Sequence, residues 1–199
     1  MSKVIPLVFN ETELVKSIDE LPRLARVAFA AACAERMIPA YERFSAQTHK
    51  GDPRILTQIL ARLWDDLAGN RMSATEVDAN INACMQLIPQ DDCSWVLEQA
   101  AAEDGAAALT YALRCRRSGL AQEAAWAARR AYDALDEFVI NRDNIDINAT
   151  GAAAQVRSDP LVQSELTRQQ RDLDELLRGA ITQDQLRERS NTEAADFLV

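Results

Sequence analysis

The sequence predicts an all-α protein that forms a single multi-helix domain of about seven or eight helices. Three observations lead to this prediction. Apolar residues recur at the helical spacing of three and four along most of the chain. Short polar residues of the kind that cap helices stand directly before several of these periodic segments. The 199 residues include only six glycines and six prolines, too few for the frequent turns of a many-stranded β fold.

The second helix is predicted to be long, kinked and central to the core. It runs from Pro22 to about Gln47, after a short first helix over residues 11–21. Residues 27–34 are apolar on every side of the helix, so we expect other helices to surround it. Pro39 lies inside this helix and cannot donate a hydrogen bond to the carbonyl of Glu35, which predicts a kink or a break near this position.

Capping signals delimit the remaining helices. Asp52 and Pro53 suit the first two positions of the third helix, and Ser73 with Glu76 forms a capping-box pattern for the fourth. The stretch over residues 141–157 is predicted to be irregular. The other predicted helices cover residues 53–67, 73–88, Asp92 or Ser94 to Arg116, 121–139, 160–178 and a short charged segment from Thr182.

The domain is predicted to span residues 1–190, and residues 191–199 are predicted to form a C-terminal tail. The tail ends in the apolar residues Phe197, Leu198 and Val199. Burying these side chains supplies roughly 4–6 kcal/mol, before an ordering cost of about 1–2 kcal/mol for each residue of the preceding segment. Because the two nearly cancel, a frayed tail is slightly favoured, and docking on this chain or on a second copy is the alternative.

Charge and cysteine usage restrict the partners and the compartment. The formal net charge is −9, whereas a free-standing duplex-binding domain needs a basic face, so we predict no nucleic-acid partner. No apolar run approaches the ~20 residues of a membrane span, and the N-terminus does not resemble a signal peptide. The four cysteines are spread out without a CxxC motif, as is typical of reduced thiols. The sequence therefore predicts a cytoplasmic protein with no membrane association.

Residues 29–67 carry a specific order of motifs. The order is ACAERM, Pro39, Tyr41, Phe44, Thr48, Gly51-Asp52 and Trp64. It resembles the bacterial YjaG-like family, a domain of unknown function with the number 416. The resemblance is strongest over the first third of the chain and stays collinear further on. It implies a bacterial cytoplasmic protein with one all-helical domain, and it transfers no catalytic residue, cofactor or ligand.

Glu35 is the strongest candidate for chemistry. It shares a helix face with Ala28, Ala31 and Ala32, so we expect it to be mostly buried and hydrogen-bonded. Burial raises the pKa of a carboxyl group, which is how general acids and bases are made. A structural ion pair, for example with Arg62, is the more common explanation of such a residue.

Arg36, Tyr41 and the single histidine, His49, follow Glu35 within about four helical turns. Together these four residues define a candidate ligand pocket at the predicted kink. A pair of His49 and Asp52, acting as a base and its orienting group, is one interpretation. A solvated loop histidine is the more common one.

The sequence predicts no metal and no cofactor. Asn144, Asp146 and Asn148 alternate like calcium ligands, but Ala149 and Gln155 stand where an EF-hand needs Gly and Glu. A weak cation site of another kind remains open at this loop. No dinucleotide-binding glycine motif, Walker loop or HExxH motif occurs in the chain.

Two functions from different classes remain. The first is a non-enzymatic helical protein that binds another protein or forms a homodimer, in line with the missing catalytic motifs and the acidic composition. The alternative is a small-ligand-binding protein or enzyme with a pocket at the Glu35–Tyr41 kink. The two differ in whether Glu35 and Arg36 face a cavity or find partners in a closed core.

Overall fold

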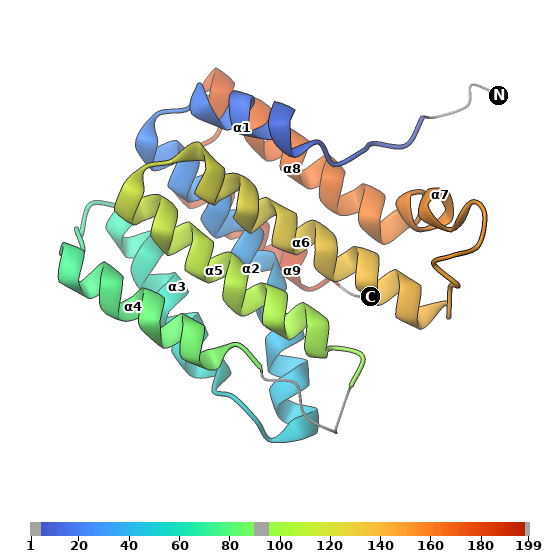
Figure 1. Cartoon of the computed structure of the whole chain (residues 1–199). Helices are drawn as coiled ribbons and strands as arrows, with labels where there is room; N and C mark the ends of the chain where they lie inside the picture. Colours follow the sequence, from blue (N-terminus) through green and yellow to red (C-terminus); the bar gives the residue numbers. More distant parts are fainter. Residues whose placement is uncertain (1–4, 90–95, 198–199) are drawn as a thin grey trace.

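The computed structural model describes residues 5–89 and 96–197, and this part of the chain is built from helices without a strand. The all-α prediction is confirmed, with nine helices in the described residues (Figure 1). Their bounds are α1 Glu11–Asp19, α2 Arg23–Thr48, α3 Pro53–Leu67, α4 Ala74–Leu87, α5 Gln99–Ser118, α6 Ala121–Arg142, α7 Ala152–Arg157, α8 Pro160–Arg178 and α9 Gln183–Ala194.

Helix α2 forms the centre of the molecule. It contacts α3, α5, α6, α8 and α9, and residues 27–34 are fully buried, as the all-round apolar pattern predicts. The helix runs through Pro39 without a break. Met37, Ile38, Ala40 and Tyr41 are buried on either side of the proline, so tertiary packing holds both halves in one helix despite the lost hydrogen bond.

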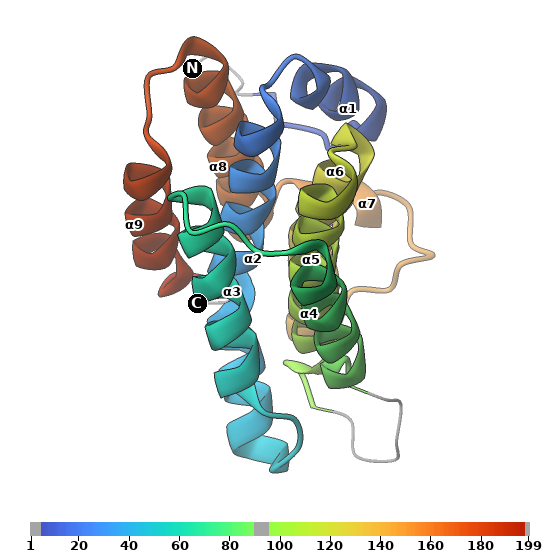
Figure 2. The ribbon, with the colours of Figure 1, turned by 90° about the vertical axis from the view of Figure 1, so that its left-hand side faces the viewer.

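The other helices cover α2 on opposite sides. Helices α5 and α6 pack against each other and against one side of α2, while α8 and α9 lie on another side (Figures 1 and 2). Alanines line much of the α5–α6 contact and allow the helices to approach closely. Gly105 of α5 faces Met37, and a Cβ added there would lie 3.4 Å from the Met37 Cβ. This arrangement leaves the α5–α6 side and the α8–α9 side as separate faces.

Local capping signals fix most helix starts. Asn10, Asp52, Ser73, Asp159 and Thr182 each accept a backbone N–H at the start of a helix, and Thr182 forms a capping box with Gln185. One expectation was wrong, because α7 lies inside the stretch predicted to be irregular. Its small alanines and the burial of Val156 hold this single turn in place. The predicted start of α5 at Asp92 or Ser94 lies outside the described residues.

The C-terminal segment packs on the domain. Helix α9 continues to Ala194, within the part of the sequence assigned to a tail, and Phe197 is buried. Arg43 of α2 donates a hydrogen bond of 2.9 Å to the carbonyl of Phe197. A frayed tail therefore does not describe Phe197, whereas Leu198 and Val199 lie outside the described residues.

Candidate functional site

The four candidate residues, three on α2 and His49 directly after it, do not line one cavity. Glu35 opens onto a groove beside α9, while the neighbouring Arg36 is enclosed between α2 and α8. Tyr41 lines a separate hollow beyond Pro39, and His49 caps the end of the helix. The single pocket expected at the kink is thus replaced by different surroundings for each residue.

Glu35 lies on the floor of a groove of about 440 Å³. The indole N–H of Trp64 donates a hydrogen bond of 2.7 Å to the Glu35 carboxylate. Burial raises the pKa of Glu35, and the Trp64 hydrogen bond and the positive charge of Arg187 oppose this rise. Arg62, the partner suggested by the sequence, instead pairs with Glu76 at 2.7 Å. The groove is otherwise lined by α9 residues, namely Asp184, Arg187, Glu188 and Asn191.

Arg36 is fully buried and is bound by two carboxylates of α8. Its guanidinium donates to both oxygens of Glu165, at 2.9 and 2.8 Å, and to Asp172 at 3.0 Å. Burial alone would lower the pKa of Arg36, but the charges and hydrogen bonds of its partners, with Glu165 foremost and Asp172 adding to it, together outweigh burial and hold the pKa well above its usual range. Gln169 completes the cluster by donating to Glu165 at 2.9 Å. Arg36 therefore has its partners in a closed core.

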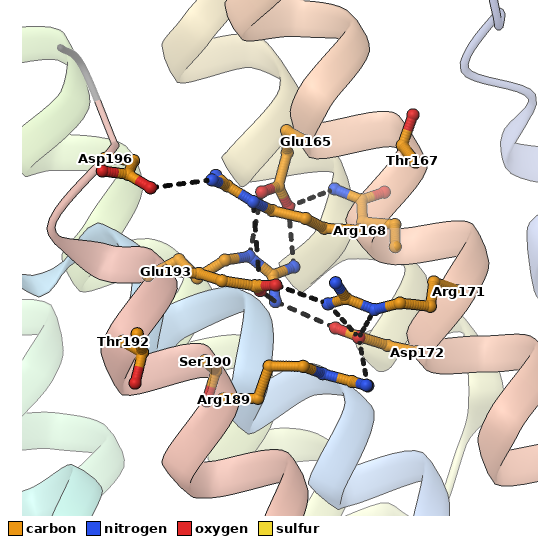
Figure 3. A network of polar contacts seen from close by, with 12 residues as sticks. Glu165, Thr167, Arg168, Arg171, Asp172, Arg189, Ser190, Thr192, Glu193 and Asp196 are labelled. Carbon is orange, nitrogen blue, oxygen red and sulfur yellow. Dashed lines mark hydrogen bonds and ion pairs between the residues drawn. The ribbon is translucent and has the colours of Figure 1, made fainter.

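Helix α9 extends this buried cluster towards the surface (Figure 3). One carboxylate oxygen of Glu193 forms an ion pair with Arg171 at 2.7 Å, and the other oxygen lies 3.8 Å from Arg36. Arg189 reaches back to Asp172 at 2.7 Å. Three helices are thus joined by one network of alternating charges, and the buried Leu186 and Ala194 give this polar helix its apolar contact with the domain.

Tyr41 and His49 occupy the far end of α2. The Tyr41 hydroxyl donates a hydrogen bond of 2.7 Å to the carbonyl of Leu87, beside a pocket of about 220 Å³. His49 is exposed and takes a left-handed conformation as the C-terminal cap, with φ of 58°. Asp52 accepts hydrogen bonds from the backbone and side chain of Arg54, so the base–orienter interpretation has no geometric support.

An acidic groove lies between α5 and α6. We define it by its five carboxylates. It has a volume of about 590 Å³ and also contains Arg129 and Arg130. The carboxylates are Glu103 and Asp104 of α5 and Asp133, Asp136 and Glu137 of α6.

Three carboxyl groups of the acidic groove have raised pKa values. Burial raises the pKa of Asp104 to about 7, although Arg130 donates to it at 3.0 Å, and nearby Asp133 and Glu137 add to the rise. Burial also raises the pKa of Asp136 and of Glu137, and repulsion from Asp133 contributes to both. A positive charge bound nearby would stabilise the ionised form of each of these carboxyl groups.

Sequence reasoning missed this groove, although a signal for half of it was present. Asp133, Asp136 and Glu137 stand at spacings of three and four and so share one helix face. Glu103 and Asp104 join them only because α5 packs on α6, which the sequence does not reveal. The groove is therefore a product of tertiary structure.

The cysteines of the described chain are poor nucleophiles. Cys33, Cys84 and Cys115 are buried, and burial raises the pKa of each thiol. Cys93 lies outside the described residues. Within residues 5–89 and 96–197, no three His, Cys, Asp or Glu side chains gather as a metal site requires. None of the helices in this part of the chain combines the length and the apolar character that a membrane crossing needs.

The family model described as "Protein of unknown function (DUF416)" matches residues 13–194, nearly the whole chain. The chain belongs to the DUF416 family. The sequence resemblance at residues 29–67 is thereby confirmed at the level of the family. The fold is also similar to the crystal structure of a DUF416 family protein from Shewanella baltica OS155, with a TM-score of 0.77. The two chains share 18% identity over 92% of this chain and 93% of the other, so this similarity supports the DUF416 fold alone. A comparison with curated proteins gives no significant match.

Proposed function

We propose that this protein is a non-enzymatic, cytoplasmic binding protein whose acidic groove holds a cationic segment of a protein partner. The observation that carries the proposal is the gathering of five carboxylates in one hollow, with raised pKa values at Asp104, Asp136 and Glu137. Carboxylates of one sign at short range repel each other, and this repulsion is relieved when a cation binds.

The charge balance of the groove favours a cation with several positive charges. The five carboxylates exceed the two arginines by three. Glu137 has no side-chain partner among the described residues, and Glu103 is bonded only to the neutral amide of Gln99, at 3.0 Å. Neither side chain has a cationic partner among the described residues, so both can receive lysine or arginine side chains of a partner.

An enzymatic function has less support. The described cysteines are buried, and His49 is not oriented by Asp52. The acidic groove offers carboxylates that can bind and hold a charge, which is what a docking site for a basic peptide needs.

The test is a calorimetric titration with a defined probe. The probe is a synthetic helical peptide with lysine at every fourth position, and its counterpart carries glutamine at the same positions. We expect the lysine peptide to bind and the glutamine peptide not to bind. The double variant Glu103→Gln/Glu137→Gln should bind the lysine peptide about tenfold more weakly, since two attractive charges are lost.

The matched control is the double variant Glu20→Gln/Glu42→Gln, which removes the same negative charge from exposed positions outside the groove. Equal weakening by both double variants would show that net charge alone attracts the peptide. That outcome would refute a specific site in the groove.

A second candidate is a small cationic ligand in the groove at Glu35. The observation that favours it is the carboxylate of Glu35, held by Trp64 at 2.7 Å on the floor of a polar hollow. A thermal-shift titration with spermidine tests it. A rise in melting temperature that disappears in Glu35→Gln, and persists in Glu103→Gln/Glu137→Gln, would support this site.

A further inference from the structure

We propose that the binding surface of the acidic groove continues along α5 and α6 to an aromatic platform, formed by Tyr111, Arg114 and Trp126, which binds an aromatic side chain of the same cationic partner. The platform adds a second chemical requirement to the proposed function of the groove, on which this inference rests. Helices α5 and α6 run side by side along the face toward the viewer in Figure 1, and no other helix of the described chain lies in front of them.

The aromatic platform is a stack of two rings and a guanidinium group. The ring centroids of Tyr111 on α5 and Trp126 on α6 lie 5.4 Å apart. The guanidinium carbon of Arg114 lies 5.5 Å from the centroid of the Tyr111 ring and 5.9 Å from that of Trp126. Both aromatic side chains are only partly buried, and Arg114 is exposed. Tryptophan, tyrosine and arginine are the residue types most enriched among those that dominate the binding energy of protein interfaces.

A buried carboxylate fixes the position of Arg114. Glu123, in the first turn of α6, is buried and accepts hydrogen bonds from the Arg114 guanidinium at 3.0 and 3.2 Å. This pair holds the guanidinium against the two rings, so the aromatic platform is ordered before a partner binds, which lowers the entropy cost of binding. The charge of Glu123 also offsets that of Arg114, so the platform does not repel a cationic partner.

The aromatic platform and the acidic groove are two ends of one surface. Arg130 connects them, because it donates to Asp104 at 3.0 Å and stands four residues after Trp126 on α6. Burial alone would lower the pKa of Arg130, but Asp104 and nearby Tyr111 both contribute to raising it. Spacings of three and four place the residues of each helix on one face. Partly buried or exposed side chains stand at 103, 107, 111 and 114 on α5 and at 126, 130, 133 and 137 on α6.

The occupant we assign is an amphipathic helical segment that is cationic at one end and carries an aromatic residue towards the other. The surplus of carboxylates in the acidic groove selects lysine or arginine, and the aromatic platform selects a flat apolar ring. Trp126 stands seven residues before Asp133, which corresponds to about 10 Å along α6. A helix lying along this surface therefore carries its aromatic residue about two turns from its nearest lysine.

The experiment is a calorimetric titration with two extended forms of the lysine peptide. Each form carries one phenylalanine seven residues beyond the terminal lysine, at either the N-terminal or the C-terminal end, and has a counterpart with alanine at that position. We expect one of the two phenylalanine peptides to bind the wild type about tenfold more tightly than its alanine counterpart.

Two protein variants locate the gain in affinity. In Trp126→Ala the phenylalanine and alanine peptides should bind equally. The matched control is Met85→Ala, which removes an exposed apolar side chain of α4 outside the groove and should preserve the tenfold difference. The same difference in Trp126→Ala as in the wild type would overturn the proposal.

Measurements on the wild type keep the proposal falsifiable if Trp126→Ala does not fold. A photoreactive benzoylphenylalanine in place of the phenylalanine should cross-link to the segments around Tyr111 and Trp126, and a cross-link to any other part of the chain would overturn the proposal. If the alanine peptides bind and phenylalanine adds nothing at either end, the platform is refuted while the proposed function of the groove stands. If none of these peptides binds the wild type, both are refuted.

Discussion

The α9 interface and the acidic groove both concentrate charged side chains, but they differ in how those charges are paired. At the α9 interface each carboxylate meets an arginine, so that Glu165, Asp172 and Glu193 surround Arg36. In the acidic groove Asp133 pairs with Arg129 and Asp104 with Arg130, but the other three carboxylates have no arginine partner among the described residues. Burial and repulsion raise the pKa of Asp104 and Glu137 there. Paired charges hold the fold together, whereas charges of one sign cost stability and are suited to bind an outside partner.

The largest expected effect comes from removing the centre of the paired region. The variant Arg36→Ala leaves Glu165 and Asp172 buried without their common partner, which should lower the free energy of unfolding by about 3–5 kcal/mol. Urea unfolding followed by circular dichroism measures the loss. In the control variant Arg54→Ala, which breaks only the exposed pair with Asp52, the change should be far smaller, because water and salt screen such a pair. Similar losses in both variants would contradict the structural role of the cluster.

Removing Glu35 should lower the free energy of unfolding for the same reason, by a smaller amount. In Glu35→Ala the buried indole N–H of Trp64 loses its acceptor, and the free energy of unfolding should fall by about 1–3 kcal/mol. Glu35→Gln keeps an acceptor oxygen and should recover most of that loss in the same urea titration. An unchanged melting temperature for Glu35→Ala would show that the Trp64 hydrogen bond contributes nothing to stability.

The raised pKa of Asp104 in the acidic groove should make the free energy of unfolding depend on pH. The folded-state pKa of Asp104 is raised to about 7 from 3.8, so between these values the folded protein binds the extra proton and loses stability as the pH rises. The groups that face Asp104 are Arg130, Asp133 and Glu137. Between pH 5.5 and 8 the free energy of unfolding should fall by about 1–2 kcal/mol more in the wild type than in Asp104→Asn. Parallel curves for the two proteins would count against this assignment.

The smallest effect is expected at the edge of the groove. Glu137→Gln removes a repelling charge from an exposed position and should raise the free energy of unfolding by no more than about 0.5 kcal/mol. Differential scanning calorimetry compares it with Glu42→Gln, which lies outside the groove and should have no effect. A clear loss of stability in Glu137→Gln would mean that this carboxylate has a stabilising partner.

The fold was predictable because its determinants are local. Capping residues such as Asp52 and Thr182 and the helical spacing of apolar residues act within a few positions of each other. The continuity of α2 through Pro39 was less predictable, because it depends on neighbouring helices that hold both halves. The same holds for the burial of Phe197, which depends on α9 and on Arg43 of α2.

The candidate sites were predictable only in part. Burial of Arg36 follows from the apolar helix around it, but its partners Glu165 and Asp172 lie 129 and 136 residues further along the chain. The spacing of Asp133 and Glu137 predicts one acidic face of α6. The α5 residues that complete the groove could not be predicted, because only the packing of α5 on α6 brings them there. Charge pairing between distant segments is set by tertiary structure, which single-sequence patterns do not encode.

The most direct test of the central claim is the pH dependence of binding to the lysine peptide, measured by calorimetry at pH 6 and pH 8. The lysines stay charged throughout this range, whereas Asp104, with a pKa of about 7, ionises within it. If the acidic groove is the binding site, the wild type should bind about fivefold more tightly at pH 8, equivalent to about 1 kcal/mol, and Asp104→Asn should lose this difference. Equal affinity of the wild type at both pH values, or the same pH dependence in Asp104→Asn, would contradict the account.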